Sequence, residues 1–73
     1  METTEDKKQQ YRTYIGKHIA EERSKLGLSQ RDLASMAGYD PATIAKIELG
    51  RWSAGIDVLG MIAEAMGLRV DLI

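Results

Sequence analysis

Apolar residues recur at intervals of three and four along most of the chain, which is the spacing of one face of an α-helix. The first such stripe is expected to end at Gly27, a residue suited to the left-handed turn that closes a helix. Its members are Tyr11, Ile15, Ile19, Glu22 and Leu26. Residues 1–10 hold no apolar side chain after the first methionine and mix both charge signs, so a flexible, solvated tail is expected there.

Two short helices with clear start signals are predicted next. In the stretch "LSQRDLASMAG", Ser29 can cap a helix, Asp32 stands three residues later as in a capping box, and Gly38 closes the helix. Asp40 is a second capping residue. Pro41 then occupies a first helical position, where its missing N–H is not needed.

The apolar positions of these two helices predict a shared core. Ile44 and Ile47, three residues apart, are expected to face inward in a helix that stops at Gly50. Their expected partners in the preceding helix are Leu33, Ala34 and Ala37. A further amphipathic helix, ending at Gly67, carries Ile56, Leu59, Ile62, Ala63 and Met66. Gly60 interrupts it at a cost of roughly 1 kcal/mol relative to alanine, and either close packing or simple tolerance would explain that glycine.

The last stretch, "LRVDLI", changes to a period of two. Leu68, Val70 and Leu72 alternate with Arg69 and Asp71, which predicts a β-strand over residues 68–73. A single strand cannot satisfy its own backbone, and no other segment reads as its partner. We therefore expect a second copy of the chain to pair with it through these three apolar residues as a dimerisation element. The domain proper then spans residues 11–67.

Composition removes several classes of function. A chain of 73 residues is one small domain. It contains no cysteine and a single histidine, His18, so neither a disulfide framework, a metal site nor a cofactor is expected. No apolar run is long enough to cross a bilayer, and a cytoplasmic protein is expected. No nucleophile with its base, phosphate-cradling loop or paired-carboxylate cleft is recognisable, which argues against an enzyme.

Two short helices joined by a tight turn define a helix-turn-helix, and the spacing of three residues supports that interpretation. Counted from Gln30 as the first position, the fifth is Ala34, the ninth Gly38 and the fifteenth Ile44. A small residue is needed where the two helix axes approach, a glycine where the turn requires positive φ, and a branched apolar residue to close the miniature core.

These residues lie in a stretch that resembles the Cro and phage-repressor type of helix-turn-helix family, also called the XRE family. The resemblance is carried by "LGLSQRDLASMAGYDPATIAKIELGR" and by the following "IDVLGMIAEAMGL", and it covers residues 14–68. It implies a compact all-α domain of four to five helices whose third helix enters the major groove of double-stranded DNA. It further implies a homodimer on a palindromic operator, and a structural pair between Arg23 and Glu48.

The resemblance also assigns DNA contacts by position. Pro41, Ala42 and Lys46 would face base edges, and of these only Lys46 can donate hydrogen bonds to guanine O6 and N7. Direct base readout by this helix is therefore expected to be thin. The candidates for contacts to the DNA backbone are Gln30, Arg31, Thr43 and Arg51.

The formal charge of −1 and the pI of about 5.7 differ from the basic balance of many nucleic-acid binders. A few well-placed cations suffice for local contact, so modest, strongly salt-dependent binding is expected. The sequence favours a dimeric, sequence-specific transcriptional regulator, most simply a repressor. The alternative is an antitoxin that binds a partner protein, a toxin, and autoregulates its operon. The sequence does not choose between them.

Overall fold

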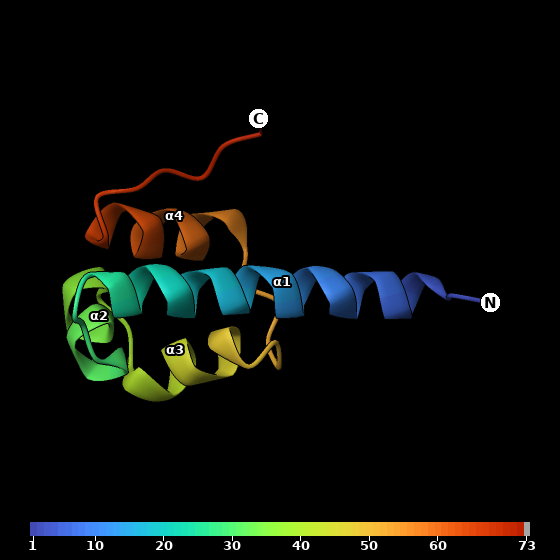
Figure 1. Ribbon diagram of the computed structural model, residues 1–73, viewed down its shortest axis with the longest axis horizontal. Coiled ribbons are helices and arrows are strands. Elements are labelled where there is room, and N and C mark those ends of the chain that lie inside the picture. Colours follow the sequence, from blue (N-terminus) through green and yellow to red (C-terminus); the bar gives the residue numbers. More distant parts are fainter. Residues whose placement is uncertain (73) are drawn as a thin grey trace.

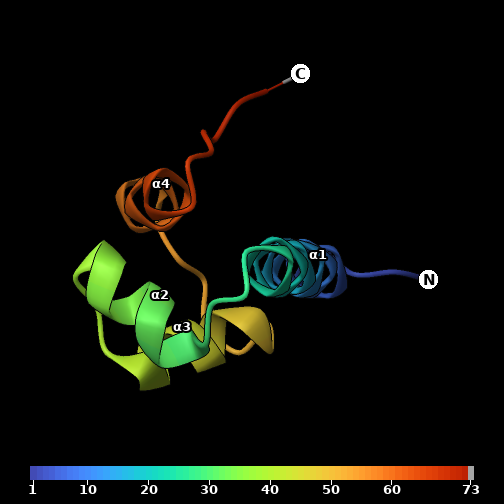
Figure 2. The same cartoon turned by 60° about the vertical axis from the view of Figure 1, so that its left-hand side comes forward.

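The computed structural model describes residues 1–72, and these form four helices without a strand (Figure 1). The helices are α1 (Thr4–Lys25), α2 (Gln30–Ala37), α3 (Pro41–Glu48) and α4 (Ile56–Ala65). Helix α1 is a long rod that lies to one side of α2, α3 and α4, as the turned view shows (Figure 2). The prediction of an all-α fold with four helices is confirmed.

Helix α1 begins at Thr4, well before Tyr11 where the apolar stripe starts, so the expectation of a flexible tail is wrong for residues 4–10. A capping box starts the helix. The Asp6 backbone amide donates to Thr3 Oγ1 at 3.1 Å, and the Thr3 amide donates to Asp6 Oδ2 at 3.0 Å. The residues that follow include lysine, glutamine and glutamate, which are good helix formers even where no apolar face is buried.

The predicted ends of α2 and the start of α3 are confirmed, with one correction. The capping box joins Ser29 and Asp32, Gly38 adopts a left-handed φ of 85°, and Pro41 is the first residue of α3. Asp40 stands at the N-cap, but its side chain makes no capping hydrogen bond. The amide of Thr43, which such a side chain would bind, instead donates to the backbone carbonyl of Asp40 at 3.0 Å.

The core lies where α2, α3 and α4 meet beneath α1. Leu33, Ile44 and Ile62 are its fully buried large side chains. The other buried members are Ile19, Ala34, Ala37, Ile47 and Met66. The predicted inward faces of α2 and α3 are therefore confirmed, whereas the predicted stripe on α1 is too long, because its two end residues, Tyr11 and Leu26, are exposed.

Helix α4 packs mainly on α2 and ends in a turn at Gly67, where φ is 73°. A Cβ added at Gly60 would meet no atom within 4 Å, so close packing does not explain that glycine. The predicted strand is wrong for residues 68–72, which have no regular secondary structure. A strand needs the backbone of a neighbour, and one copy of this chain supplies none. Ile73, the last residue of that prediction, lies outside the described residues.

Within residues 1–72, no helix is both long enough and apolar enough to traverse a bilayer.

Candidate nucleic-acid interface

The turn between α2 and α3 holds the two helices against each other. Ala34 is buried where the helices approach, and its carbonyl accepts the amides of Gly38 at 2.9 Å and Tyr39 at 2.8 Å. Tyr39 packs against the core. Ile44, with no exposed surface, closes the small core between the helices. Of the three predicted anchors, Ala34 and Ile44 are therefore buried, and Gly38, which is exposed, closes α2 through its hydrogen bond to Ala34.

The two faces of α3 differ sharply. Ile44 and Ile47 are buried, whereas Pro41, Ala42 and Lys46 are exposed on the outer face. Figure 2 shows α3 on the side of the molecule away from α4, so the rest of the chain does not cover this face. A helix with an open outer face and a fixed inner face can be inserted into a groove without rearrangement of the domain.

The residues expected at the DNA backbone do not all have the same freedom. Arg31 and Arg51 are exposed, and Thr43 is half-buried near the start of α3. Gln30 is also half-buried, and its side-chain Nε2 donates to Glu48 Oε1 at 2.9 Å. The side-chain nitrogen of Gln30 is therefore engaged in a hydrogen bond within the protein, which the sequence did not indicate.

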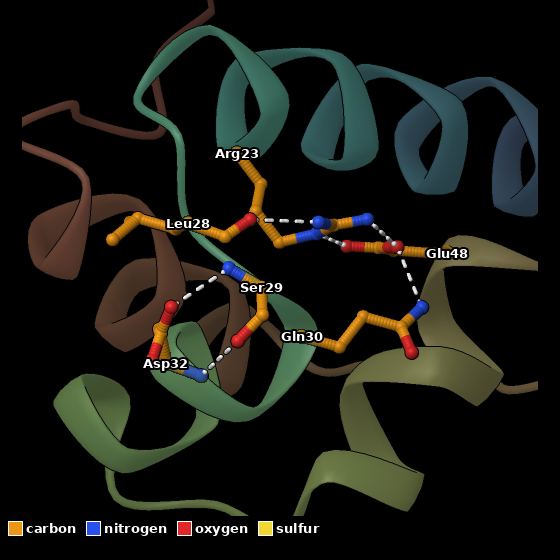
Figure 3. A network of polar contacts seen from close by, with 6 residues as sticks. All are labelled: Arg23, Leu28, Ser29, Gln30, Asp32 and Glu48. Carbon is orange, nitrogen blue, oxygen red and sulfur yellow. Dashed lines mark hydrogen bonds and ion pairs between the residues drawn. The ribbon is translucent and has the colours of Figure 1, made fainter.

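A fork of hydrogen bonds joins α1 to the end of α3 (Figure 3). Arg23 Nε donates to Glu48 Oε2 at 2.7 Å, and Arg23 Nη2 donates to Glu48 Oε1 at 3.0 Å. The third nitrogen, Nη1, donates to the Leu28 carbonyl at 2.8 Å. The hydrogen bonds that Arg23 donates to Glu48 raise the pKa of the Arg23 guanidinium above its ordinary value. Together with Gln30, this fork ties α1, α2 and α3 to one carboxylate.

Three cations lie on or beside the helix-turn-helix without a carboxylate partner. Among the described residues, none of the ion pairs involves Arg31, Lys46 or Arg51. Glu48 is occupied by Arg23, but Asp40 is exposed and its carboxylate is not bound to backbone amides. The Asp40 carboxylate therefore stands as an exposed acidic group at the start of α3, in the same helix-turn-helix as these cations.

Sequence reasoning missed three residues that set the position of α3. Gly16 on α1 is buried, and a Cβ there would overlap the carbonyl oxygen of Ile47 and lie 2.7 Å from that of Glu48. Gln9 and Thr13, farther toward the start of α1, contact Gly50. With Arg23 they follow the three-and-four spacing of one helix face, but this face is small and polar, so a search for apolar periodicity passes over it.

Comparison with known proteins shows the family to which the chain belongs. A family model described as "Helix-turn-helix" matches residues 19–73, which is most of the chain. The chain belongs to this helix-turn-helix family, of the Cro and phage-repressor (XRE) type. An uncharacterized HTH-type transcriptional regulator from Methanothermobacter thermautotrophicus is 41% identical over 49 residues, covering 67% of this chain and 71% of that protein.

Similarity also extends to a longer relative and a solved structure. Human endothelial differentiation-related factor 1 is 41% identical over 56 residues, covering 77% of this chain but 38% of the human protein. The chain thus spans less than half the length of this relative. The crystal structure of the clp gene regulator ClgR from C. glutamicum superposes with a TM-score of 0.79 at 25% identity, covering 81% of this chain and 76% of that one.

Proposed function

We propose that the chain is a sequence-specific, double-stranded DNA-binding transcriptional regulator that inserts α3 into the major groove. The observation that carries this proposal is the contrast between the two faces of α3, buried at Ile44 and Ile47 and open at Pro41, Ala42 and Lys46. Membership of the helix-turn-helix family supports it. Binding at a promoter by this route excludes other proteins from the same DNA, so repression is the simplest outcome.

Within that function, Lys46 is the residue that reads hydrogen-bonding groups on bases, through guanine O6 and N7. Ala42 offers a methyl group to thymine, and Pro41 supplies apolar surface only. Arg31, Thr43 and Arg51 contact phosphates, and Gln30 does so through the part of its side chain that Glu48 does not hold. With one strong base reader, much of the affinity comes from phosphate contacts and is sensitive to salt.

We also propose that the regulator acts as a homodimer that joins through the segment after α4. Leu68, Val70 and Leu72 expose apolar side chains there. Leu68 and Val70 line an open groove of about 520 Å³ between α1 and α4, where Ile62 and Met66 are also among the lining residues. In a dimer, each segment would bury these apolar side chains against the other copy.

Sedimentation of a variant with serine at these three segment positions tests the dimer, with Arg69→Gln as the control in the same segment. A dimer that survives the serine substitutions contradicts this interface.

The experiment that tests DNA recognition is selection of bound duplexes from a random pool at defined salt. We expect a palindrome whose half-sites lie about one helical turn apart. Selection of a single, non-repeated half-site would retain DNA binding and contradict the dimer. Recovery of no preferred sequence at low salt would contradict sequence-specific readout by α3.

The same exposed apolar segment favours a second candidate, an antitoxin or adaptor whose main partner is another protein. Leu72 is fully exposed, and a partner such as a toxin would cover it together with Leu68 and Val70. Purification from the native host distinguishes the candidates, because a stoichiometric second protein is expected only for the antitoxin or adaptor. A complex containing this chain alone favours the homodimeric regulator.

A further inference from the structure

The first turns of α1 contact the residues that follow the recognition helix. These turns, residues 4–13, precede the part of the chain that matches the helix-turn-helix family, which begins at residue 19. Gln9 donates from its side-chain Nε2 to the Gly50 carbonyl at 2.8 Å, across 41 positions of sequence. The start of α1 is therefore attached to the loop that carries Arg51.

The side chain of Gln9 is itself held in a defined orientation. Arg12 donates to Gln9 Oε1 from Nη2 at 3.0 Å and from Nε at 3.3 Å. The Nε2 of Gln9 also donates to Thr13 Oγ1 at 3.1 Å. Because Arg12 can only donate hydrogen bonds, it requires the Gln9 oxygen to face it, and the nitrogen then faces Gly50.

Gly50 is the residue at which the backbone leaves α3. It packs so closely against Thr13 that the backbone has no room to shift there. Its φ is 71°, and a Cβ there would lie 2.9 Å from Thr13 Oγ1 and 3.0 Å from Thr13 Cα. The Gly50 amide donates to the Ile47 carbonyl at 3.0 Å, and the Arg51 amide donates to the Lys46 carbonyl at 2.9 Å. This is the Schellman pattern that closes a helix with a left-handed glycine.

The peptide between Gly50 and Arg51 is consequently fixed at both of its polar atoms. Its carbonyl oxygen accepts from Gln9, and its N–H donates to the carbonyl of Lys46. This one peptide joins the residue proposed to read bases, Lys46, to the residue proposed to grip a phosphate, Arg51. Rotation of the peptide would change the direction in which the Arg51 side chain leaves the backbone.

We propose that Gln9 is a positioning residue for DNA binding, which orients Arg51 toward the phosphate backbone by holding the Gly50 carbonyl. The proposal rests on the DNA-binding function proposed above. It gives the first turns of α1 a role in the strength of binding, although they lie outside the family match. Gln9 does not touch the bases, so it affects affinity and not the sequence that is chosen.

The test compares Gln9→Ala and Gln9→Glu with Gln10→Ala. Gln10 lies in the same turn of α1 as Gln9, but its side chain donates to Glu2, which precedes the helix, and not to the loop. The probe is the duplex selected from the random pool. Loss of one ordered hydrogen bond predicts binding weaker by roughly three- to ten-fold for Gln9→Ala. Gln9→Glu should weaken binding more, because its carboxylate cannot donate to the carbonyl and adds a negative charge. Gln10→Ala should match the wild type.

Two further measurements separate positioning from a merely structural role. In Gln9→Ala, the dependence of DNA affinity on salt concentration should fall by an amount equivalent to up to about one phosphate contact. In an Arg51→Ala background, Gln9→Ala should not change the DNA affinity further. Equal salt dependence in Gln9→Ala and Gln10→Ala, or full additivity with Arg51→Ala, overturns the proposal. Hydrogen exchange at the Arg51 amide in the free protein needs no DNA, and faster exchange in Gln9→Ala alone is expected.

These outcomes also distinguish this proposal from the proposed function. If the wild-type protein selects no duplex, the DNA-binding function fails, and the exchange measurement still reports whether Gln9 holds the loop. If the wild type binds and the Gln9 variants bind equally well with unchanged exchange, the positioning role alone is refuted.

Discussion

Replacement of Arg23 by alanine would leave the Glu48 carboxylate without its main partner. Only 6% of the Glu48 side chain and 17% of the Arg23 side chain are exposed, so water reaches this site poorly. The substitution removes both hydrogen bonds of the fork and the bond from Arg23 to the Leu28 carbonyl. Glu48 then retains one neutral donor, the side chain of Gln30.

The expected magnitude follows from these contacts. Removal of one member of a buried ion pair typically costs about 3 to 5 kcal/mol, because the other charge stays buried and unpaired. Here Gln30 remains and water can enter the space of the lost guanidinium, so we expect a loss of about 2 to 3 kcal/mol in the free energy of unfolding. For a domain of this size, that loss lowers the melting temperature by roughly 10 to 20 °C.

The assay is urea unfolding followed by circular dichroism, with Lys25→Ala as the control. Lys25 also pairs with a glutamate of α1, Glu22, at 3.0 Å, but 69% of its side chain is exposed. An exposed pair of this kind contributes less than about 1 kcal/mol. If Arg23→Ala and Lys25→Ala lose the same stability, the argument from burial is refuted.

The mechanism has a second consequence. Adding Glu48→Gln to Arg23→Ala removes the stranded charge and should restore part of the loss, because a neutral amide is less costly to bury than a carboxylate. The DNA sequence selected by folded Arg23→Ala should be unchanged, since Arg23 lies behind α3 and not on its outer face. A changed sequence preference would show that the fork does more than join helices.

Gly16→Ala should destabilise the fold by more than about 2 kcal/mol in thermal unfolding, because its Cβ would overlap the Ile47 carbonyl. Gly60→Ala, in open space within α4, should instead stabilise it by about 0.5 to 1 kcal/mol, and equal effects would contradict the close approach of α1 and α3. The pKa of Asp32 lies below its ordinary value of 3.8, mainly because the backbone amide of its capping partner binds the ionised carboxylate. The capping bond of ionised Asp32 therefore stabilises the fold above the ordinary pKa of 3.8, and this stabilisation is lost as the pH falls through the lower pKa of the folded state. In urea unfolding, the stability of Asp32→Asn should consequently depend less on pH below about pH 4. Lys46→Ala should weaken operator binding by about 1 to 3 kcal/mol and relax the preference at one base position, and an unchanged profile of selected sequences would remove its role in readout.

Local signals in the sequence determined where α2 begins and ends and where α3 begins. These signals are the capping pair Ser29 and Asp32, Gly38 and Pro41. Each affects the backbone only within about four residues, so its effect can be predicted without knowledge of the rest of the fold. The start of α1 was available in the same way, because Thr3 and Asp6 form a capping box, but the charged composition of the segment pointed to a tail.

Apolar periodicity likewise predicted the inward faces of α2 and α3, because burial of Leu33 and Ile44 follows directly from helical geometry. The same reasoning extended the stripe on α1 to Tyr11 and Leu26, which the tertiary structure leaves exposed. It also predicted a strand after α4, although a strand requires a neighbouring backbone that alternation in the sequence cannot provide.

Only the tertiary structure decided which small and polar residues meet across the helices. Gly16 matters because α1 crosses the end of α3 at that residue, and Gln9 matters because the same crossing brings it to Gly50. Glu48 meets Gln30 for the same reason, whereas its pair with Arg23 was already expected from the family resemblance. Such contacts depend on helix axes and crossing angles set by the whole core, whereas caps and periodic faces depend on neighbours in sequence alone.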